Sequence, residues 1–88
     1  MDLRDKITSM LEREIADVFM LDKTHIEAHH ELKFREDLVA TSLQYFPILT
    51  ALEEELDIDI DFHEFQIEAK TIAQAIDYIT ALYIAQQK

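Results

Sequence analysis

The chain has 88 residues, no cysteine and no glycine, and its 19 acidic and 8 basic side chains give a net charge of −11. A chain of this length forms one domain, residues 1–88, with a small core and no room for a separate catalytic domain. Its acidity argues against nucleic acid and anionic membranes as partners and favours basic protein surfaces, and the lack of cysteine excludes thiolate chemistry by its own side chains.

The first residues do not resemble a targeting segment. Charged side chains are scattered through residues 1–6, and no long apolar run occurs anywhere in the sequence. A signal peptide needs a continuous apolar segment, and a membrane-spanning helix needs about 20 predominantly apolar residues. We therefore expect a cytoplasmic monomer that does not insert into membranes.

A first helix is predicted from Asp2 to about Phe19. Apolar side chains recur there at helical spacing, which indicates one buried face, and Asp2 is suited to cap the helix start. The apolar positions are Leu3, Ile7, Met10, Leu11, Ile15 and Val18.

The periodicity fades over residues 20–41, which we interpret as a long loop. Leu21, Ile26, Leu32 and Phe34 remain as spaced apolar anchors. A short helical turn is possible within the loop, near residues 24–29. A loop this long is expected to be ordered or functional.

A second helix is predicted from Ser42 to about Leu56. The residues Tyr45, Leu49, Leu52 and Leu56 follow the helical period, so Ser42 lies at or near the N-cap. Free N–H groups and the helix dipole favour an anion there, and a phosphate ester on Ser42 would suit that place. The alternative is that this serine only caps the helix.

Three features of the backbone around this helix are unusual. Pro47 stands at the edge of the first turn, so the regular helix begins after Ser42, or its first turn is kinked, or the proline is simply tolerated there. Without glycine, Asp57 or Asp59 must provide any left-handed helix end. Val39 is β-branched and is not expected to adopt a positive φ.

Two more helices complete the prediction of an all-α four-helix bundle with a long first loop and a short third helix. The third helix spans Asp61 to Ile67, is capped by Asp61 and turns Phe62, Phe65 and Ile67 inward. The fourth opens with a capping box of Thr71 and Gln74 and runs to about Ala85. Its apolar stripe is Ile72, Ile76, Ile79 and Tyr83.

Residues from about Leu32 to Leu82 resemble the acyl carrier protein family. The resemblance rests on the order and spacing of Phe34, Asp37-Leu38, Ser42-Leu43, Ala51-Leu52-Glu53-Glu54-Glu55-Leu56, Thr71 and Ala75-Ile76-Asp77-Tyr78-Ile79. It implies that Ser42 carries a 4′-phosphopantetheine arm derived from coenzyme A, whose thiol holds acyl groups as thioesters for fatty-acid, polyketide or related lipid biosynthesis. It also implies a phosphopantetheinyl transferase and acyl-transferring or condensing enzymes with basic surfaces as partners.

The sequence departs from the family pattern at two positions beside the serine. Thr41 stands in place of an aspartate, giving Thr-Ser-Leu, and Val39 stands in place of a glycine. The resemblance therefore implies a specialised carrier with altered partner recognition. The residues assigned to that recognition are Glu36, Asp37, Thr41, Leu43, Gln44, Glu53 and Glu54.

Other functions remain as alternatives. The chain could be an aminoacyl or peptidyl carrier, or an interaction module that keeps the fold without the arm. An enzyme is not expected, because Ser42 lies in no Gly-x-Ser-x-Gly elbow. A metal site is not expected either, because His25, His29 and His30 lack a clear further ligand.

Overall fold

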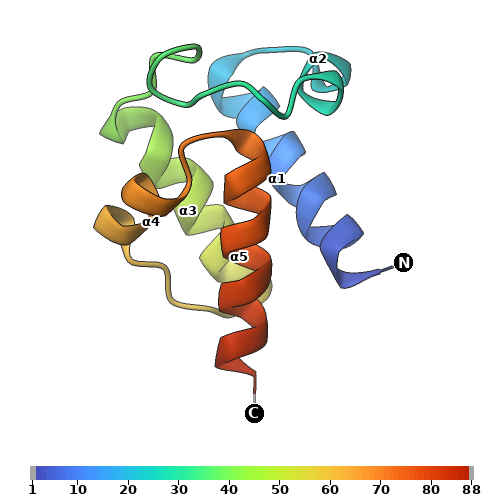
Figure 1. Ribbon diagram of the computed structural model, residues 1–88, viewed down its shortest axis with the longest axis vertical. Helices are drawn as coiled ribbons and strands as arrows, with labels where there is room; N and C mark the ends of the chain where they lie inside the picture. Colours follow the sequence, from blue (N-terminus) through green and yellow to red (C-terminus); the bar gives the residue numbers. More distant parts are fainter. Residues whose placement is uncertain (1, 88) are drawn as a thin grey trace.

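Five α-helices and the loops between them make up residues 2–87, the part of the chain that the computed structural model describes (Figure 1). They are α1 (Leu3–Phe19), α2 (Lys23–Ala28), α3 (Ser42–Leu56), α4 (Phe62–Glu68) and α5 (Ile72–Gln86). The predicted helical bundle is confirmed, and α2 is the short turn expected inside the long loop. None of the described helices is long and apolar enough to cross a bilayer.

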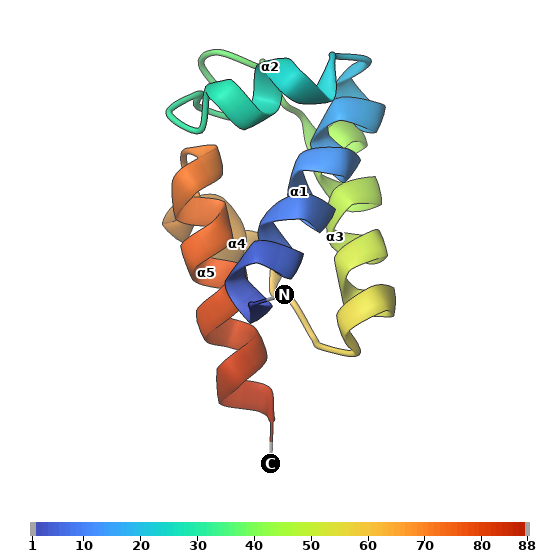
Figure 2. The same cartoon turned by 90° about the vertical axis from the view of Figure 1, so that its right-hand side faces the viewer.

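The three long helices run along the molecule, and α2 lies across one end of them (Figure 2). Helix α1 packs against both α3 and α5, while α4 packs against α5 and α2 against α1. The loop that contains α2 therefore covers the end at which α3 and α5 begin.

The apolar stripes predicted for the long helices face a common core. Burying a large aliphatic side chain contributes about 1.5–3 kcal/mol, so these stripes determine how the helices pack. The buried positions include Ile7, Leu11 and Ile15 of α1, Tyr45, Leu49, Leu52 and Leu56 of α3, and Ile72, Ile76 and Ile79 of α5.

Two of the predicted inward positions are wrong. The side chain of Ile67 is 54 % exposed, because it comes two residues after the buried Phe65 and so lies about 200° around the short helix α4. Leu21 is 37 % exposed and does not anchor the loop, a role that falls to the fully buried Ile26 and Phe34.

Side chains cap the helix starts as predicted at three places. Asp2 and Asp61 each accept a hydrogen bond from a backbone N–H in the first turn of α1 and α4, respectively. At α5, the Thr71 hydroxyl accepts from the N–H of Gln74, and the Gln74 side chain accepts from the N–H of Thr71, which completes the capping box.

Two loop expectations are decided by backbone angles. Asp57 ends α3 with φ of 54°, as predicted for one of the two candidate aspartates. The expectation for Val39 is wrong, because its φ is 55°. A hydrogen bond from the N–H of Ala40 to the carbonyl of Phe34, at 2.8 Å, closes the loop that imposes this conformation.

Pro47 lies inside α3, and the helix nevertheless begins at Ser42. Proline has no N–H, so the carbonyl of Leu43, four residues earlier, loses its usual helical partner. The exposed position of Pro47 leaves that carbonyl close to water, which lessens the cost of the missing bond. The tolerated proline is thus the interpretation that agrees with the structure.

The long loop is joined to the start of α5 by backbone hydrogen bonds. The N–H groups of Ile72 and Ala73 donate to the carbonyls of Leu32 and His30, at 3.1 and 2.9 Å. The N–H of Phe34 donates to the carbonyl of Lys70 at 3.0 Å. The first two of these bonds satisfy N–H groups that the first turn of α5 cannot pair internally.

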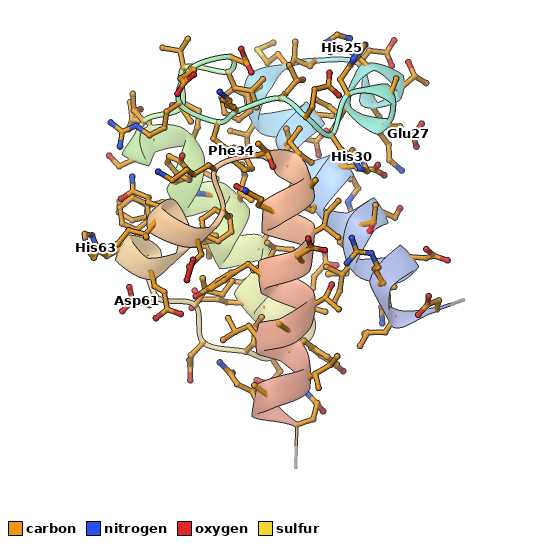
Figure 3. All side chains as sticks on the ribbon, in the orientation of Figure 1. His25, Glu27, His30, Phe34, Asp61 and His63 are labelled. Atoms are coloured by element: carbon orange, nitrogen blue, oxygen red, sulfur yellow. The ribbon has the colours of Figure 1, made fainter. Side chains whose placement is uncertain are left out.

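A cluster of buried aromatic rings lies where the loop, α3 and α4 meet. The ring centroids of Phe34, Tyr45 and Phe65 are 5.7 to 6.1 Å apart, and Phe34 is labelled beneath the loop in Figure 3. Tilted and edge-to-face pairs at such distances add about 0.5–1.5 kcal/mol each beyond area burial. The cluster fixes the loop that precedes Ser42.

Candidate functional site at the start of helix α3

Thr41, rather than Ser42, is the N-cap of α3. The Thr41 hydroxyl accepts a hydrogen bond from the N–H of Leu43 at 3.3 Å, and the Gln44 side-chain oxygen accepts from the N–H of Thr41 at 2.8 Å. These contacts form a capping box. Ser42 is therefore the first residue of the helix and is not needed to cap it.

The side chain of Ser42 is free for chemistry. Ser42 is exposed, and among residues 2–87 its hydroxyl makes no hydrogen bond. The backbone N–H of Ser42 also has no partner within the described residues. The free N–H of Ser42 and the helix dipole favour an anion near the serine.

Apolar side chains surround the serine on the protein surface. Leu43 is 79 % exposed, Val39 is 71 % exposed and Phe46 is 52 % exposed. The ring of Phe46 lies 4.6 Å, between centroids, from that of Phe62 on α4. We call Val39, Leu43 and Phe46 the apolar rim. Of this set, only Leu43 was assigned to recognition from the sequence.

The acidic residues that precede the serine are partly engaged within the loop. The carboxylate of Asp37 accepts a hydrogen bond from the N–H of Lys33 at 2.8 Å, and Glu36 forms an ion pair with the Lys33 ammonium at 3.3 Å. Both acids are exposed, so they remain accessible to a basic partner. Gln44 is used in the capping box and is less available.

Glu53 and Glu54 are separate from the serine. They lie 11 and 12 residues further along α3, which corresponds to about 17 Å at the helical rise. Glu53 accepts a hydrogen bond from the N–H of Ile60 at 2.9 Å and so holds the next loop, whereas Glu54 is exposed. The predicted recognition residues therefore form two groups rather than one surface.

The histidines of the long loop contact carboxylates. His30 Nε2 lies 2.7 Å from the carboxylate of Glu12, which is buried on α1, and His29 lies 3.1 Å from Glu31. Figure 3 labels His30 beside α1. Within residues 2–87 no group of three or more side chains is arranged to hold a metal ion. The pair of His30 and Glu12 was missed from the sequence, since helical spacing alone did not indicate a buried acid.

A second feature missed from the sequence is a cavity of about 370 Å³ between the loop, α3 and α4. Lys33, Arg35 and Lys70 contribute to its lining, as does Tyr45 from α3. These cations come from two segments far apart in the chain, so no local motif indicates that they meet.

No protein-family model matches this chain, and no solved structure matches it significantly.

Proposed function

We propose that the protein is a specialised acyl carrier, with a 4′-phosphopantetheine arm on Ser42 that holds acyl groups as thioesters. The proposal rests on the likeness to acyl carrier proteins in the order of residues 32–82, and the all-helical bundle is compatible with it. In this role the chain performs no chemistry itself and presents its cargo to separate enzymes.

The observation that supports this function best is the exposed, unbonded hydroxyl of Ser42 at the first residue of α3. A transferase must reach this oxygen, and capping by Thr41 leaves it available. A phosphodiester at that place would lie close to the free N–H of Ser42 and to the positive end of the helix dipole, which favour negative charge. The arm itself would supply the thiol that this cysteine-free chain lacks.

The apolar rim and the outer carboxylates would contribute the partner contacts. Exposed apolar side chains such as Leu43 bury area in an interface, while Glu36 and Asp37 attract basic enzyme surfaces. Glu53 and Glu54 would add a second, more distant contact along α3.

A second candidate is an interaction module that uses the same surface without the arm. Two observations favour it: Thr41 gives no carboxylate beside the serine, and three large apolar side chains of the rim are exposed around it. An aminoacyl or peptidyl carrier would use Ser42 in the same way and differ only in its cargo.

Arm transfer to the purified protein tests the proposal. Incubation with coenzyme A and a broad-specificity phosphopantetheinyl transferase should add one phosphopantetheine to the intact mass. Ser42→Ala should abolish the addition, whereas Ser9→Ala, the matched change at the other serine of the chain, should not.

The outcomes separate the two candidates. A wild-type protein that no transferase modifies, in the test tube or in its own cells, would favour the interaction module. Modification that persists in Ser42→Ala would show that another side chain is the acceptor and would overturn the assignment of Ser42.

A further inference from the structure

The cavity between the loop, α3 and α4 concentrates positive charge in an otherwise acidic molecule. Three of the eight basic residues, Lys33, Arg35 and Lys70, line it. Like charges gathered in one concave site repel one another unless a partner compensates them. In a chain with 19 acidic side chains, this concentration indicates a site for an anion.

The charges in the cavity are only partly neutralised by the protein. Lys33 is paired with Glu36, which also lines the cavity, at 3.3 Å. Arg35 and Lys70 form no ion pair within residues 2–87, although Arg4, Arg13 and Lys23 elsewhere on the surface do. Two positive charges are therefore left without an internal partner.

Tyr45 provides an independent indication of a ligand. Its residue is only 2 % exposed, its hydroxyl makes no hydrogen bond to any described residue, and it forms part of the cavity lining. Since the structure contains no fully buried side-chain polar atom without a partner among residues 2–87, this hydroxyl must reach solvent through the cavity. A polar group that is otherwise enclosed thus points its donor into the site.

Burial raises the pKa of the Tyr45 hydroxyl above its ordinary value, although the nearby Arg35 guanidinium acts in the opposite direction. The hydroxyl consequently keeps its proton at neutral pH and can donate a hydrogen bond.

The backbone holds the cationic residues in place. Lys33 is paired with Thr71 in an isolated antiparallel bridge, and the N–H of Phe34 donates to the carbonyl of Lys70. The segments that carry Lys33, Arg35 and Lys70 therefore run side by side at the cavity. Helix α4 closes another side with Ile67 and with His63, which Figure 3 shows on the outer side of that helix.

We propose that this cavity binds a small organic phosphate monoester, with its phosphate between Arg35 and Lys70 and its apolar part against Ile67. A phosphate monoester bears a charge of about −1.5 to −2 at neutral pH, which matches the two unpaired cations. The planar guanidinium of Arg35 can bind phosphate oxygens in pairs, and the Tyr45 hydroxyl can donate to a third. A volume of about 370 Å³ is within the range of small-molecule sites.

This site is independent of arm attachment, because none of its lining residues is Ser42 or a residue of the apolar rim. Failure of one proposal therefore leaves the other standing. The phosphate site is tested on unmodified protein, to which no arm has been attached.

Titration with phenyl phosphate, followed by amide chemical shifts in NMR spectra, tests the proposal. The shifts should concentrate on residues 33–36, on Tyr45 and on residues 63–70. Arg35→Gln and Lys70→Gln should each weaken binding at least about fivefold, because each removes one charge-assisted contact. Tyr45→Phe, which deletes only the hydroxyl, should weaken it by a smaller factor.

Lys6→Gln is the matched control, since Lys6 is an exposed cation on α1 that also forms no ion pair within the described residues. It makes the same change in net charge and should alter affinity by less than about twofold, because it lies outside the cavity. Inorganic phosphate should shift the same residues with lower affinity, and phenol should not bind.

Three results would overturn the proposal. Chemical-shift changes scattered over the whole surface, or equal losses of affinity in Lys6→Gln and Lys70→Gln, would show that phenyl phosphate is attracted by the overall charge and has no specific site. Benzoate binding as tightly as phenyl phosphate would overturn the assignment to phosphate monoesters. Amide spectra of the free variants verify that each remains folded.

Discussion

Helices α3 and α5 begin with the same capping box but differ in the residue next to it. Thr41 and Gln44 cap α3, and Thr71 and Gln74 cap α5, in each case with reciprocal hydrogen bonds. After the cap of α5 comes Ile72, which is 0 % exposed. After the cap of α3 comes the exposed Ser42.

The two helix starts also differ in whether neighbouring residues bind their first N–H groups. At α5 the carbonyls of the long loop accept hydrogen bonds from the N–H groups of Ile72 and Ala73. At α3 the N–H of Ser42 stays open within the described residues, and the adjacent Leu43 faces solvent. One helix start is thus built into the core and the other is presented to solvent. Only the second can be reached by a partner.

The largest expected effect concerns the first residue of each helix. Ile72→Ala should lower the free energy of unfolding by about 2–5 kcal/mol, because it leaves a cavity in the core. Ser42→Ala should change it by no more than about 0.5 kcal/mol, because the side chain is exposed and unbonded. Urea unfolding followed by circular dichroism measures both, and equal losses would contradict the contrast between the two helix starts.

The next effect concerns recognition and depends on the carrier function. Thr41→Asp keeps a good cap and restores the carboxylate that the family pattern has beside the serine. One charge-assisted contact is worth about 1.5–3 kcal/mol, so arm transfer by a general fatty-acid transferase should become roughly tenfold to a hundredfold faster. Thr71→Asp, the same change at α5, should leave the rate unaltered. Equal transfer rates for wild type and Thr41→Asp would show that Thr41 does not determine recognition by the transferase.

Removing each cap should have a similar and smaller effect on stability. Thr41→Ala and Thr71→Ala should each lower the free energy of unfolding by about 1 kcal/mol, because each leaves one N–H group of the first turn without its side-chain partner. Thermal unfolding monitors both variants. No change in Thr41→Ala would indicate that the cap of α3 contributes nothing to stability.

The last effect is confined to alkaline pH and arises from a hydrogen bond between α5 and α4. Tyr78 donates a hydrogen bond to Glu64 on α4, and burial, together with this bond and the charge of Glu64, raises the pKa of Tyr78 to about 12. An unfolded tyrosine has an ordinary pKa of about 10, so the unfolded chain loses this proton first. Stability from Tyr78 is therefore complete below pH 10 and declines as pH rises towards 12.

Melting temperatures of wild type and Tyr78→Phe across this alkaline range isolate that contribution. The variant should lose less stability than the wild type as pH rises. Parallel curves would mean that the tyrosine titrates alike in the folded and unfolded chains.

Much of the fold could be predicted because helices leave local patterns. The apolar periodicity predicted the positions of the long helices, and the capping residues Asp2, Asp61 and Thr71 predicted where three helices begin. The prediction that Ser42 lies at the cap of α3 overlooked the same pattern, because Thr41-Ser42-Leu43-Gln44 is a capping box of the type that identified Thr71. The side chain of Gln44 completes the box with Thr41.

The parts that could not be predicted depend on contacts distant in the chain. The positive φ of Val39 results from a loop closed over the aromatic cluster, against the preference of a β-branched residue. The exposure of Ile67, by contrast, follows from the helical period alone, since Ile67 lies about 200° around α4 from the inward Phe65. The meeting of Lys70 with Arg35 at the cavity depends on the pairing of the loop with the start of α5.

The three left-handed residues, Met20, Val39 and Asp57, have a consequence for the unfolded chain. A left-handed conformation costs a residue other than glycine roughly 1–2 kcal/mol in the folded state. A chain without glycine, however, has fewer conformations to lose when it folds, and each residue that replaces a glycine saves about 0.4–1 kcal/mol of conformational entropy. At Val39, a β-branched residue with φ of 55°, the cost exceeds the saving, so the surrounding loop must hold this conformation. The lack of glycine therefore offsets only part of the strain beside Ser42, and the remainder is borne by the contacts of the folded loop.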